Sequence, residues 1–557
     1  MSSLEKTAEQ DRQESQEEGL QAARFPLLEA DAEGRQQVTA AGREFLLDIV
    51  TDPDEDVYAI RDSFSPVTAS AAMARLSRRG DDMRVILLDE FLDPVKAKDE
   101  KLLRRVISEY GDDSVQQLAG QHLVVERASN LMTKKLEWGR VAMAYLEQST
   151  RYIRFDQRGS DGRYKYHIPA EIRAEPEAEI AYVGMMDRIF DNYSSMIETI
   201  TSQLQDQHPE PDNKREAIAL RNSIRAQACD AVRGTLPVAL ESTVGIYGSA
   251  QALEGMVVRL EADELREART IGRAVLAACR ENIGVFMERA DKPDRGGATS
   301  AYYAEKAAAM RSVIPEDLTL PAGATKPYAE LVRCNLESEL DLVADMLYEY
   351  STESLQELRE VVATLGEDQR REIFWTYIGE RLNRRHKPGR ALEELLFSWD
   401  IVCDYGIFRD LQRHKLISSL VWQTLTPYMG YEITPLVEEA GLKGVWEDCF
   451  ETSAELYRLL EEAAGKVVAQ YAVLLGHHMR WRITYNARQA FHFHELRTSP
   501  QGHPNYRRLV GQMHDTVAER FPLLGEAMKF VNQDEDPELT RLAAERHQQF
   551  KLQQLEA

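Results

Sequence analysis

The chain has 557 residues, of which 43% are hydrophobic and 29% charged, as in a soluble globular protein of two or three domains. The formal net charge of −25 argues against a nucleic-acid partner, because such partners are bound through Lys and Arg that neutralise phosphates. A small anionic ligand remains compatible, since a few Arg can converge locally. The sequence shows no long apolar run that predicts a membrane span and no signal-peptide core, and its five scattered Cys fit reduced thiols. We therefore expect a cytoplasmic protein.

The predicted elements divide the chain into two similar blocks. Residues 1–37 read as a disordered acidic tail, 38–290 as a first domain and 291–327 as a linker rich in Pro and Gly. Residues 328–535 form a second domain, and 536–557 a charged, helical and peripheral tail. Apolar spacing predicts helices within 64–79, 115–145 and 175–204. Strand-like runs at 84–88 and 399–402 suggest small mixed sheets flanked by long helices. The fold class is therefore α+β and mainly helical.

A candidate anion site lies in the first domain at Glu147-Gln148-Ser149-Thr150-Arg151-Tyr152. A phosphate is best held by several Arg, whose planar guanidinium forms paired charge-assisted hydrogen bonds, with a Ser hydroxyl beside them. In a continuous helix, Glu147 and Arg151 would share a face and Ser149 would point elsewhere. The plainer alternative is a surface ion pair between Glu147 and Arg151 with an uninvolved Ser149.

These motifs resemble the flavin-dependent thymidylate synthases, whose signature is Arg-His-Arg, seven residues, then Ser, commonly continued as Ser-x-Arg-Tyr. In the first domain, Glu147, Ser149 and Arg151 match that family's nucleotide ligands. Arg233, which stands before Leu236-Pro237, matches another nucleotide ligand. The family's Arg-His-Arg would correspond to Gly139-Arg140-Val141, so this domain lacks most of the expected flavin contacts.

The second domain shows the opposite pattern. Its Arg413-His414-Lys415 matches Arg-His-Arg, although Lys415 lacks the bidentate geometry of Arg. Asn486, Arg488 and His492 match flavin-binding positions, and Arg497, after Glu495-Leu496, matches a nucleotide ligand. The Ser position is Gln423, the Arg-Tyr after it is Leu425-Thr426, and the Arg before Leu-Pro has become Gln470. Asp410 replaces a Gln of the family, which changes the expected recognition of uracil.

The two domains therefore look like divergent tandem copies that keep complementary halves of one site. Active sites of the family lie between subunits, so two copies that meet as subunits do would form one composite site and one blank site. The resemblance implies a nucleotide side with Glu147, Ser149, Arg151, Arg233 and Arg497, of which Ser149 and Arg497 are the expected catalytic residues. It implies a flavin side with Arg413, His414, Lys415, Asn486, Arg488 and His492. The alternative is that both copies have lost their function and that the complementary pattern of retained motif residues arose by chance.

By the resemblance, the reaction is reductive methylation of dUMP to dTMP, with FAD as cofactor and NADPH and methylenetetrahydrofolate as co-substrates. The expected partners are the nucleotide and a second copy of the chain, as a homodimer of tandem chains, without nucleic acid or membrane. We expect no metal, because His477-His478 and His492-Phe493-His494 do not share a helix face. Two alternatives stay open, namely a flavoprotein with another nucleotide substrate and a non-catalytic nucleotide-binding or scaffold protein.

Overall fold

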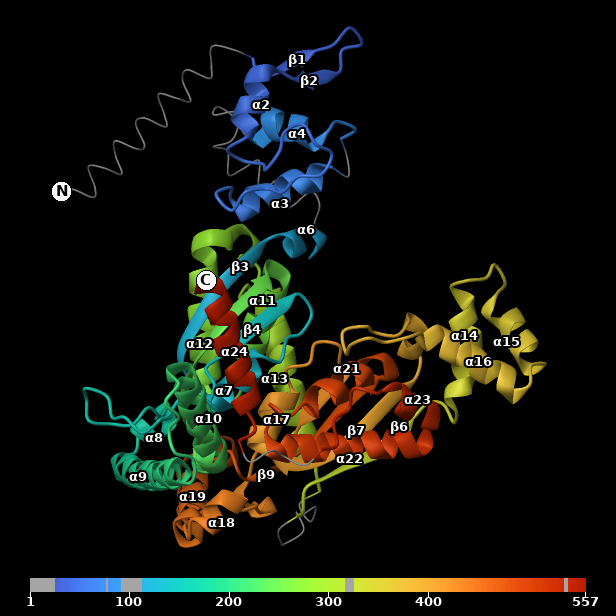
Figure 1. Ribbon diagram of the computed structural model, residues 1–557. Coiled ribbons are helices and arrows are strands. Elements are labelled where there is room, and N and C mark those ends of the chain that lie inside the picture. Colours follow the sequence, from blue (N-terminus) through green and yellow to red (C-terminus); the bar gives the residue numbers. More distant parts are fainter. Residues whose placement is uncertain (1–25, 77–78, 92–112, 316–324, 535–538, 557) are drawn as a thin grey trace, which may run out of the picture.

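The computed structural model describes residues 26–76, 79–91, 113–315, 325–534 and 539–556. It consists of two repeats with the same order of elements (Figure 1). The first repeat contains β3 (Gly120–Ser129), α7 (Asn130–Leu136), β4 (Met143–Glu147), α10 (Lys214–Val232), η2 (Arg233–Thr235), β5 (Glu241–Ser249), α11 (Ala250–Glu261) and α12 (Arg266–Ile283). The second contains β7 (Leu396–Asp404), α17 (Tyr405–Leu411), β8 (Ser419–Trp422), α19 (Lys443–Ala464), α20 (Lys466–Ala469), η7 (Gln470–Ala472), β9 (His478–Asn486), α21 (Ala487–Arg497) and α22 (Pro504–Arg520).

Each repeat is built on a small sheet with the same strand order. The first sheet is β3-β5-β4 and the second is β6-β7-β9-β8, where β6 (Tyr328–Cys334) adds an edge strand. All of these pairings are antiparallel, so the sheets are antiparallel rather than mixed. The mainly helical α+β class is confirmed, because long helices flank both small sheets (Figure 1).

Two predicted elements differ from the structure. Residues 115–145 contain the end of α6 (Asp113–Leu118), then β3, α7 and β4, so the segment is helical only in part. The strands form because β5 pairs with both and supplies the hydrogen bonds that a helix would have made locally. The run 84–88 lies in α4 (Met83–Ile86) and the π-helical turn η1 (Leu87–Phe91), since a short apolar run does not distinguish a strand from a buried helix. Residues 399–402 lie within β7 as predicted.

A pseudo-twofold relation connects the repeats at their contact. Inside the first repeat, the amide of Leu131 donates to the carbonyl of Val238 (3.0 Å), and inside the second, that of Gly406 donates to Leu475 (2.9 Å). Between the repeats, Val238 donates to Val473 and Leu475 donates to Leu236, both at 2.8 Å. Pro237 and Leu474 form a bridge between these bonds. Residues 131 and 406 are therefore equivalent, as are 238 and 475, and the repeats pack as two subunits would.

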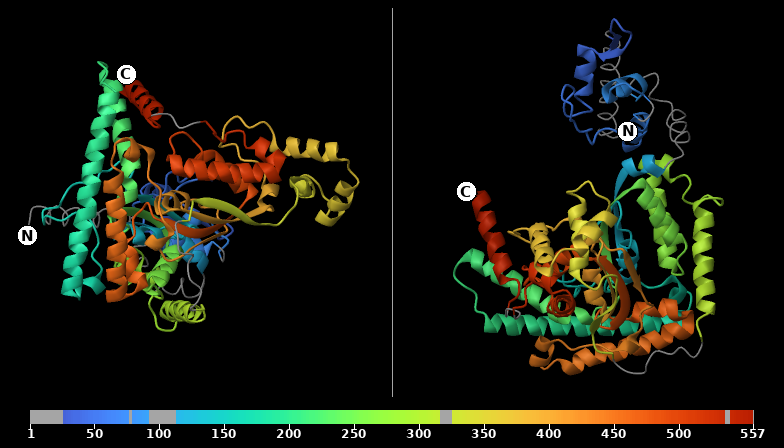
Figure 2. Two further views of the ribbon diagram at one scale, coloured as in Figure 1. Left: turned by 90° about the horizontal axis from the view of Figure 1, so that it is seen from below. Right: turned by 90° about the vertical axis from the view of Figure 1, so that its right-hand side faces the viewer.

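Long helices brace this contact on one side. The segment between Tyr152 and Arg233 contains α8 (Ala170–Arg173) and α9 (Pro176–Gln207), and α9 lies along α19 of the second repeat (Figure 2). Arg188 of α9 forms an ion pair with Asp448 of α19, and Asn192 Nδ2 donates to the same carboxylate (2.7 Å). One continuous hydrophobic core then runs through both repeats.

Smaller elements surround the repeats. The hairpin of β1 (Leu28–Ala30) and β2 (Gln36–Val38) overlaps the end of the predicted tail 1–37, of which residues 1–25 lie outside the described residues. The predicted linker contains α13 (Gly296–Ser312), and α24 (Leu542–Glu556) follows the second repeat. The remaining described α-helices are α2 (Ala40–Leu46), α3 (Pro66–Arg75), α14 (Val343–Tyr348), α15 (Leu355–Ala363), α16 (Glu367–Ile378), α18 (Pro435–Glu439) and α23 (Pro522–Ala527). Among the described helices, none has the length and apolar character to cross a membrane.

Candidate nucleotide site between the repeats

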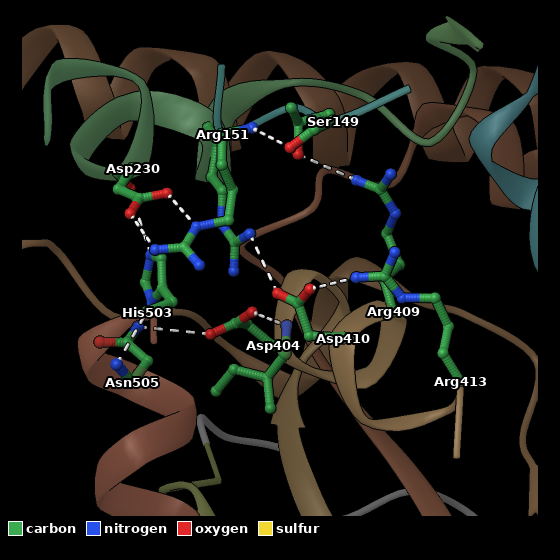
Figure 3. Close-up of polar contacts among 12 residues, drawn as sticks. Ser149, Arg151, Asp230, Asp404, Arg409, Asp410, Arg413, His503 and Asn505 are labelled. Carbon is green, nitrogen blue, oxygen red and sulfur yellow. Dashed lines mark hydrogen bonds and ion pairs between the residues drawn. The ribbon is translucent and has the colours of Figure 1, made fainter. Parts of the chain in front are cut away.

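Arg151 is held in place by α10 rather than by its own motif. The chain leaves β4 after Glu147 and turns, so that Arg151 points toward Asp230 near the end of α10 (Figure 3). Its Nε and Nη2 donate to the two Asp230 oxygens at 2.7 and 2.5 Å, and its Nη1 donates to the Gln501 carbonyl of the second repeat at 3.3 Å. This bidentate pair is almost buried. The alternative of a surface pair between Glu147 and Arg151 is therefore wrong.

Glu147 instead joins the two repeats through cations. One carboxylate oxygen accepts from Lys134 Nζ of α7 (2.9 Å), and the other lies 3.1 Å from Arg409 Nη2 of α17. Arg409 also donates to the Thr150 hydroxyl (3.2 Å). Burial by itself would raise the pKa of the Glu147 carboxyl, but Arg409 and Lys134 more than offset it and lower this pKa to about 2. Glu147 is thus a buried anion that fixes the end of β4.

Asp410 holds two further arginines, one from each repeat. Arg233 Nη1 lies 3.3 Å from one Asp410 oxygen, and Arg413 Nη2 donates to the other at 2.8 Å. Burial opposes ionisation of Asp410, yet Arg233 and Arg413 hold its pKa far below the usual range. Arg233 is almost buried, and its Nη2 has no hydrogen-bond partner among the described residues. This nitrogen is therefore free to bind a ligand.

Arg497 is oriented by His414. Arg497 Nε donates to His414 Nε2 at 2.8 Å, and its guanidinium lies 5.6 Å from the centre of the Tyr506 ring. Burial, followed by the charge of Arg497, holds the pKa of His414 well below its usual value. A neutral imidazole has one nitrogen that accepts a hydrogen bond, which is the role that Arg497 requires of it.

These side chains meet in one cavity of about 280 Å³. It is lined by six of the predicted residues, namely Glu147, Ser149, Arg151, Arg233, Arg413 and Arg497. The lining also includes Arg409, Asp410, Tyr506 and Arg541. The structure therefore brings the nucleotide-side residues of both repeats together. The segments that meet here are far apart along the sequence, and Arg151 contacts Gln501, which is 350 residues further on.

The other predicted flavin-side residues lie along α21 and after α17. Asn486 caps α21, with its side chain accepting from the Gln489 amide (2.8 Å). Arg488 donates to the Pro388 carbonyl (2.8 Å) and pairs with Glu393 (3.0 Å). These two side chains therefore have structural partners already.

His492 and Lys415 complete that group. The His492 ring lies 5.5 Å from the His414 ring, and burial together with the nearby cations Lys387 and Arg384 lowers its pKa. Lys415 is exposed. His492 is thus adjacent to the cavity through His414, whereas Lys415 is at the surface.

The sequence motifs did not identify three charged residues of this site, two arginines and one aspartate. Asp230 and Arg409 stand in helices without a motif, and Arg541 belongs to the segment expected to be a peripheral tail. The sequence carried a spacing signal for two of them. Asp230 stands three residues before Arg233, and Arg409 stands four residues before Arg413. Residues at these spacings lie on one face of a helix. Arg541 offered no such signal.

Comparison with known proteins follows the division into repeats. The family model of the thymidylate synthase complementing proteins, Thy1, matches residues 60–283 and again 330–523. The chain belongs to the Thy1 family. The two matched regions confirm two divergent tandem copies.

Relatives of similar length exist in bacteria and archaea. A UPF0159 protein of Chlamydia pneumoniae is 29% identical over 528 residues, covering 92% of this chain and 98% of that protein. A UPF0159 protein of Thermoplasma acidophilum is 27% identical over 500 residues, covering 86% and 98%. Among solved structures, a UMP/dUMP methylase from Streptomyces cacaoi bound with 5-Br dUMP is 17% identical, with a TM-score of 0.30, and covers 37% of this chain and 95% of that one.

The pseudo-twofold relation corrects the alignment of the two Thy1 repeats by one residue. Ser129 and Asp404 are the equivalent caps of α7 and α17. Gln148 and Gln423 are also equivalent, because their amides donate to the corresponding residues Thr243 and Arg480. The counterparts of Arg413-His414-Lys415 are therefore Trp138-Gly139-Arg140, not Gly139-Arg140-Val141. Likewise, Ser149 and Arg151 correspond to Thr424 and Thr426 rather than to Gln423 and Leu425. Both shifts arise because motif spacing alone places Gln423 opposite Ser149, whereas the structure places it opposite the identical residue Gln148.

A second cavity, of about 380 Å³, lies at the position related to the first by this pseudo-symmetry. Trp138 stands there in place of Arg413, Leu260 in place of Arg497 and Gln470 in place of Arg233. Trp422 takes the position of Glu147, and its ring lies 6.0 Å from that of Trp138, edge to face. At this second position the counterparts of Arg413, Arg497 and Arg233 are therefore a Trp, a Leu and a Gln, although Arg259 and Arg311 also line the cavity.

The Glu147 ion pairs predict an acid-dependent stability. Because its pKa in the folded protein is below the ordinary value of 4.5, its contribution is fully present above about pH 4.5 and is lost as the pH falls toward 2. Glu147→Gln should therefore lower the urea midpoint at pH 7, and the gap to wild type should narrow at pH 3. Glu126→Gln, at an exposed site on β3, is the matched control and should shift little. A gap that stays constant between the two pH values would contradict this account.

Proposed function

We propose that this Thy1 protein methylates dUMP reductively to dTMP at one composite site between its repeats. Methylenetetrahydrofolate is the carbon donor, NADPH the reductant and FAD the cofactor. The observation that supports this most directly is the shared cavity, in which Arg151 and Arg233 of the first repeat face the same space as Arg413 and Arg497 of the second. A nucleotide monophosphate is the ligand that such a set of guanidinium groups suits best.

The first repeat would hold the nucleotide from one side. Ser149 is half-buried in the cavity wall, and its Oγ accepts from the Arg151 amide at 3.2 Å, which leaves the hydroxyl hydrogen for a ligand. Arg233 offers the unpartnered Nη2. Fixed donors of this kind lose little conformational freedom on binding, which favours affinity.

The second repeat would act on the pyrimidine. His414 orients Arg497, and Asp410 orients Arg413, so both guanidinium groups are held before the substrate arrives. Preorganised cations of this kind stabilise negative charge that develops on a substrate during reaction. Arg497 is therefore the residue that we expect to contribute to catalysis, with Ser149 on the opposite repeat.

The residues near His492 fit an anionic cofactor. Arg384 and Lys387 lie close enough to influence His492, and Arg413 links this region to the nucleotide cavity. Arg413 and His492 would contact FAD directly, and Lys415 would face its phosphates. Asn486 and Arg488 would shape the site by fixing the start of α21 and the loop at Pro388. FAD bound there would supply the hydride that completes the methyl group.

An altered nucleotide is a second candidate substrate because of Asp410. Its carboxylate only accepts hydrogen bonds, whereas the amide of a Gln also donates them. A base with an amino group would offer donors that uracil lacks. Comparison of dUMP with dCMP therefore tests which pyrimidine the site prefers.

The first test is calorimetric titration of the purified protein with dUMP. We expect one dUMP and one FAD per chain, because the second cavity lacks the counterparts of Arg233, Arg413 and Arg497. Two dUMP per chain would contradict the composite site. The absence of nucleotide binding would favour a scaffold role.

The second test is catalysis. With dUMP and methylenetetrahydrofolate present, we expect NADPH oxidation to accompany dTMP formation, and the gene to complement thymidine auxotrophy. NADPH oxidation with another pyrimidine nucleotide would favour the altered-substrate alternative. The expected homodimer of tandem chains stays a prediction, which the mass in solution tests.

A further inference from the structure

The C-terminal segment is anchored on the helix that builds the nucleotide site. Its Leu539 and Thr540 are buried, and Thr540 Oγ1 donates to Gln227 Oε1 of α10 at 3.4 Å. Helix α24 is held on α10 by Asn222, which donates to Glu545 (3.1 Å), and by Arg546, which pairs with Glu216 (2.8 Å). Figure 1 shows α24 lying beside the first repeat rather than apart from it. Its position is therefore tied to α10, the helix that carries Asp230 and leads into Arg233.

This anchoring brings Arg541 into the wall of the cavity. The Arg541 guanidinium lies 4.3 Å from the centre of the Tyr152 ring. Tyr152 directly follows Arg151 in the sequence of the first repeat. Its Nε is buried and has no hydrogen-bond partner among the described residues. Burial, followed by the charge of Arg151, lowers the pKa of Arg541 to about 10. Arg541 as a whole is half-buried, and a partly desolvated guanidinium without an ion pair is stabilised when an anion binds to it.

The ion pairs in the cavity indicate which arginines are available to bind an anionic ligand. Asp230 pairs with Arg151, Glu147 pairs with Arg409, and Asp410 pairs with both Arg233 and Arg413. Arg497 bonds to the neutral His414, and Arg541 lies on an aromatic ring. Within the described ranges, these two guanidinium groups of the cavity have no carboxylate in ion-pair distance. A phosphate monoester, which carries a charge of about −1.5 to −2 near pH 7, would neutralise both.

We propose that Arg541 binds the phosphate of the nucleotide, and that the C-terminal segment is a fixed clasp of the composite site. This inference rests on the proposed nucleotide-binding function. Arg541 lies outside both regions that match the Thy1 model, which end at residues 283 and 523. The site thus takes a ligand-binding residue from a segment added to the two repeats. The added Arg541 occupies the same cavity wall as Tyr152 and Arg151.

Calorimetric titration of the full chain tests this role. Arg541→Ala should weaken dUMP binding by about 10- to 100-fold, the range of a charge-assisted hydrogen bond. The preference for dUMP over deoxyuridine should fall by the same factor, because deoxyuridine has no phosphate. Arg541→Lys should restore part of the affinity, since it keeps the charge but not the planar pair of donors.

Lys551→Ala is the matched control, because Lys551 is an exposed cation on the same helix, α24, and is not one of the residues that anchor this helix on α10. It should bind dUMP within about twofold of wild type, and the thermal midpoint of Arg541→Ala should match that of this control. Wild-type affinity for dUMP in Arg541→Ala would overturn the proposal.

Titration with inorganic phosphate distinguishes a failure of this proposal from a failure of the proposed function. If the wild type bound phosphate through Arg541 but did not bind dUMP, the clasp would stand and the thymidylate synthase function would fall. If the wild type bound dUMP and Arg541→Ala bound it equally well, the function would stand and the clasp would fall. Binding of neither phosphate nor dUMP would overturn both.

Discussion

Replacement of Arg497 by alanine is expected to weaken dUMP binding by about 100-fold, because truncation of a buried charged hydrogen-bonding group costs about 3 kcal/mol. The substitution removes one of the two guanidinium groups of the cavity that have no carboxylate in ion-pair distance within the described residues. It also leaves the neutral His414 Nε2 without its donor. Calorimetric titration with dUMP measures the first effect, and the rate of dTMP formation should fall further, since Arg497 also faces the developing charge.

Arg482→Ala provides the comparison for Arg497. Arg482 is an exposed arginine of β9, the strand that precedes α21, so its loss should leave dUMP affinity unchanged within about twofold. Arg497→Lys should recover little, because a lysine ammonium cannot bond to His414 and to a ligand with the geometry of a guanidinium. If Arg497→Ala bound dUMP as tightly as the wild type, the nucleotide would lie elsewhere.

Replacement of Glu495 by alanine is expected to lower the free energy of unfolding of the second repeat by about 3–5 kcal/mol, the cost of breaking a buried ion pair from one side. Arg381 donates to both Glu495 oxygens at 2.6 Å, and neither side chain is more than 3% exposed. The Arg381 guanidinium also packs on the Phe491 and Phe530 rings. Without Glu495 its charge would stay buried and uncompensated. Urea denaturation followed by tryptophan fluorescence measures the change.

Two variants show whether the lost charge is responsible. Arg381→Met combined with Glu495→Leu should recover much of the stability, because an apolar pair of similar volume carries no desolvation cost. Glu337→Ala breaks the pair with Arg520, in which the Glu337 side chain is 89% exposed, and should cost less than about 1 kcal/mol. Equal losses for Glu495→Ala and Glu337→Ala would show that burial does not set the energy of these pairs.

The local motifs were readable because each is a short run of consecutive residues. Ser149, Arg151, Arg233 and Arg497 were assigned to one cavity from their motifs alone, and the structure places them there. Asn486 and Arg488 were also found by motif, but their side chains serve the α21 cap and the loop at Pro388. A motif therefore identifies a position in the fold, whereas the surroundings decide which side chains remain free for a ligand.

Secondary structure was predicted best where a helix carries its own hydrogen bonds. The expected helix within 175–204 lies in α9, Pro176–Gln207. The expected helix within 115–145 contains β3 and β4, which exist because β5 pairs with both from about 100 residues further along the chain. Apolar spacing within 115–145 carried no information about that partner.

The sequence by itself determined the family, the presence of two copies and the complementary survival of their motifs, because these depend on residue identity within short segments. Only the tertiary structure decided the register between the copies and the entry of Arg541 into the cavity. It also decided the ion pairs of Asp230 with Arg151, of Glu147 with Arg409 and of Asp410 with Arg233. Each of these depends on contacts between segments far apart in the chain. Such contacts are set by the packing of the two repeats and of α24 on α10, which no local pattern encodes.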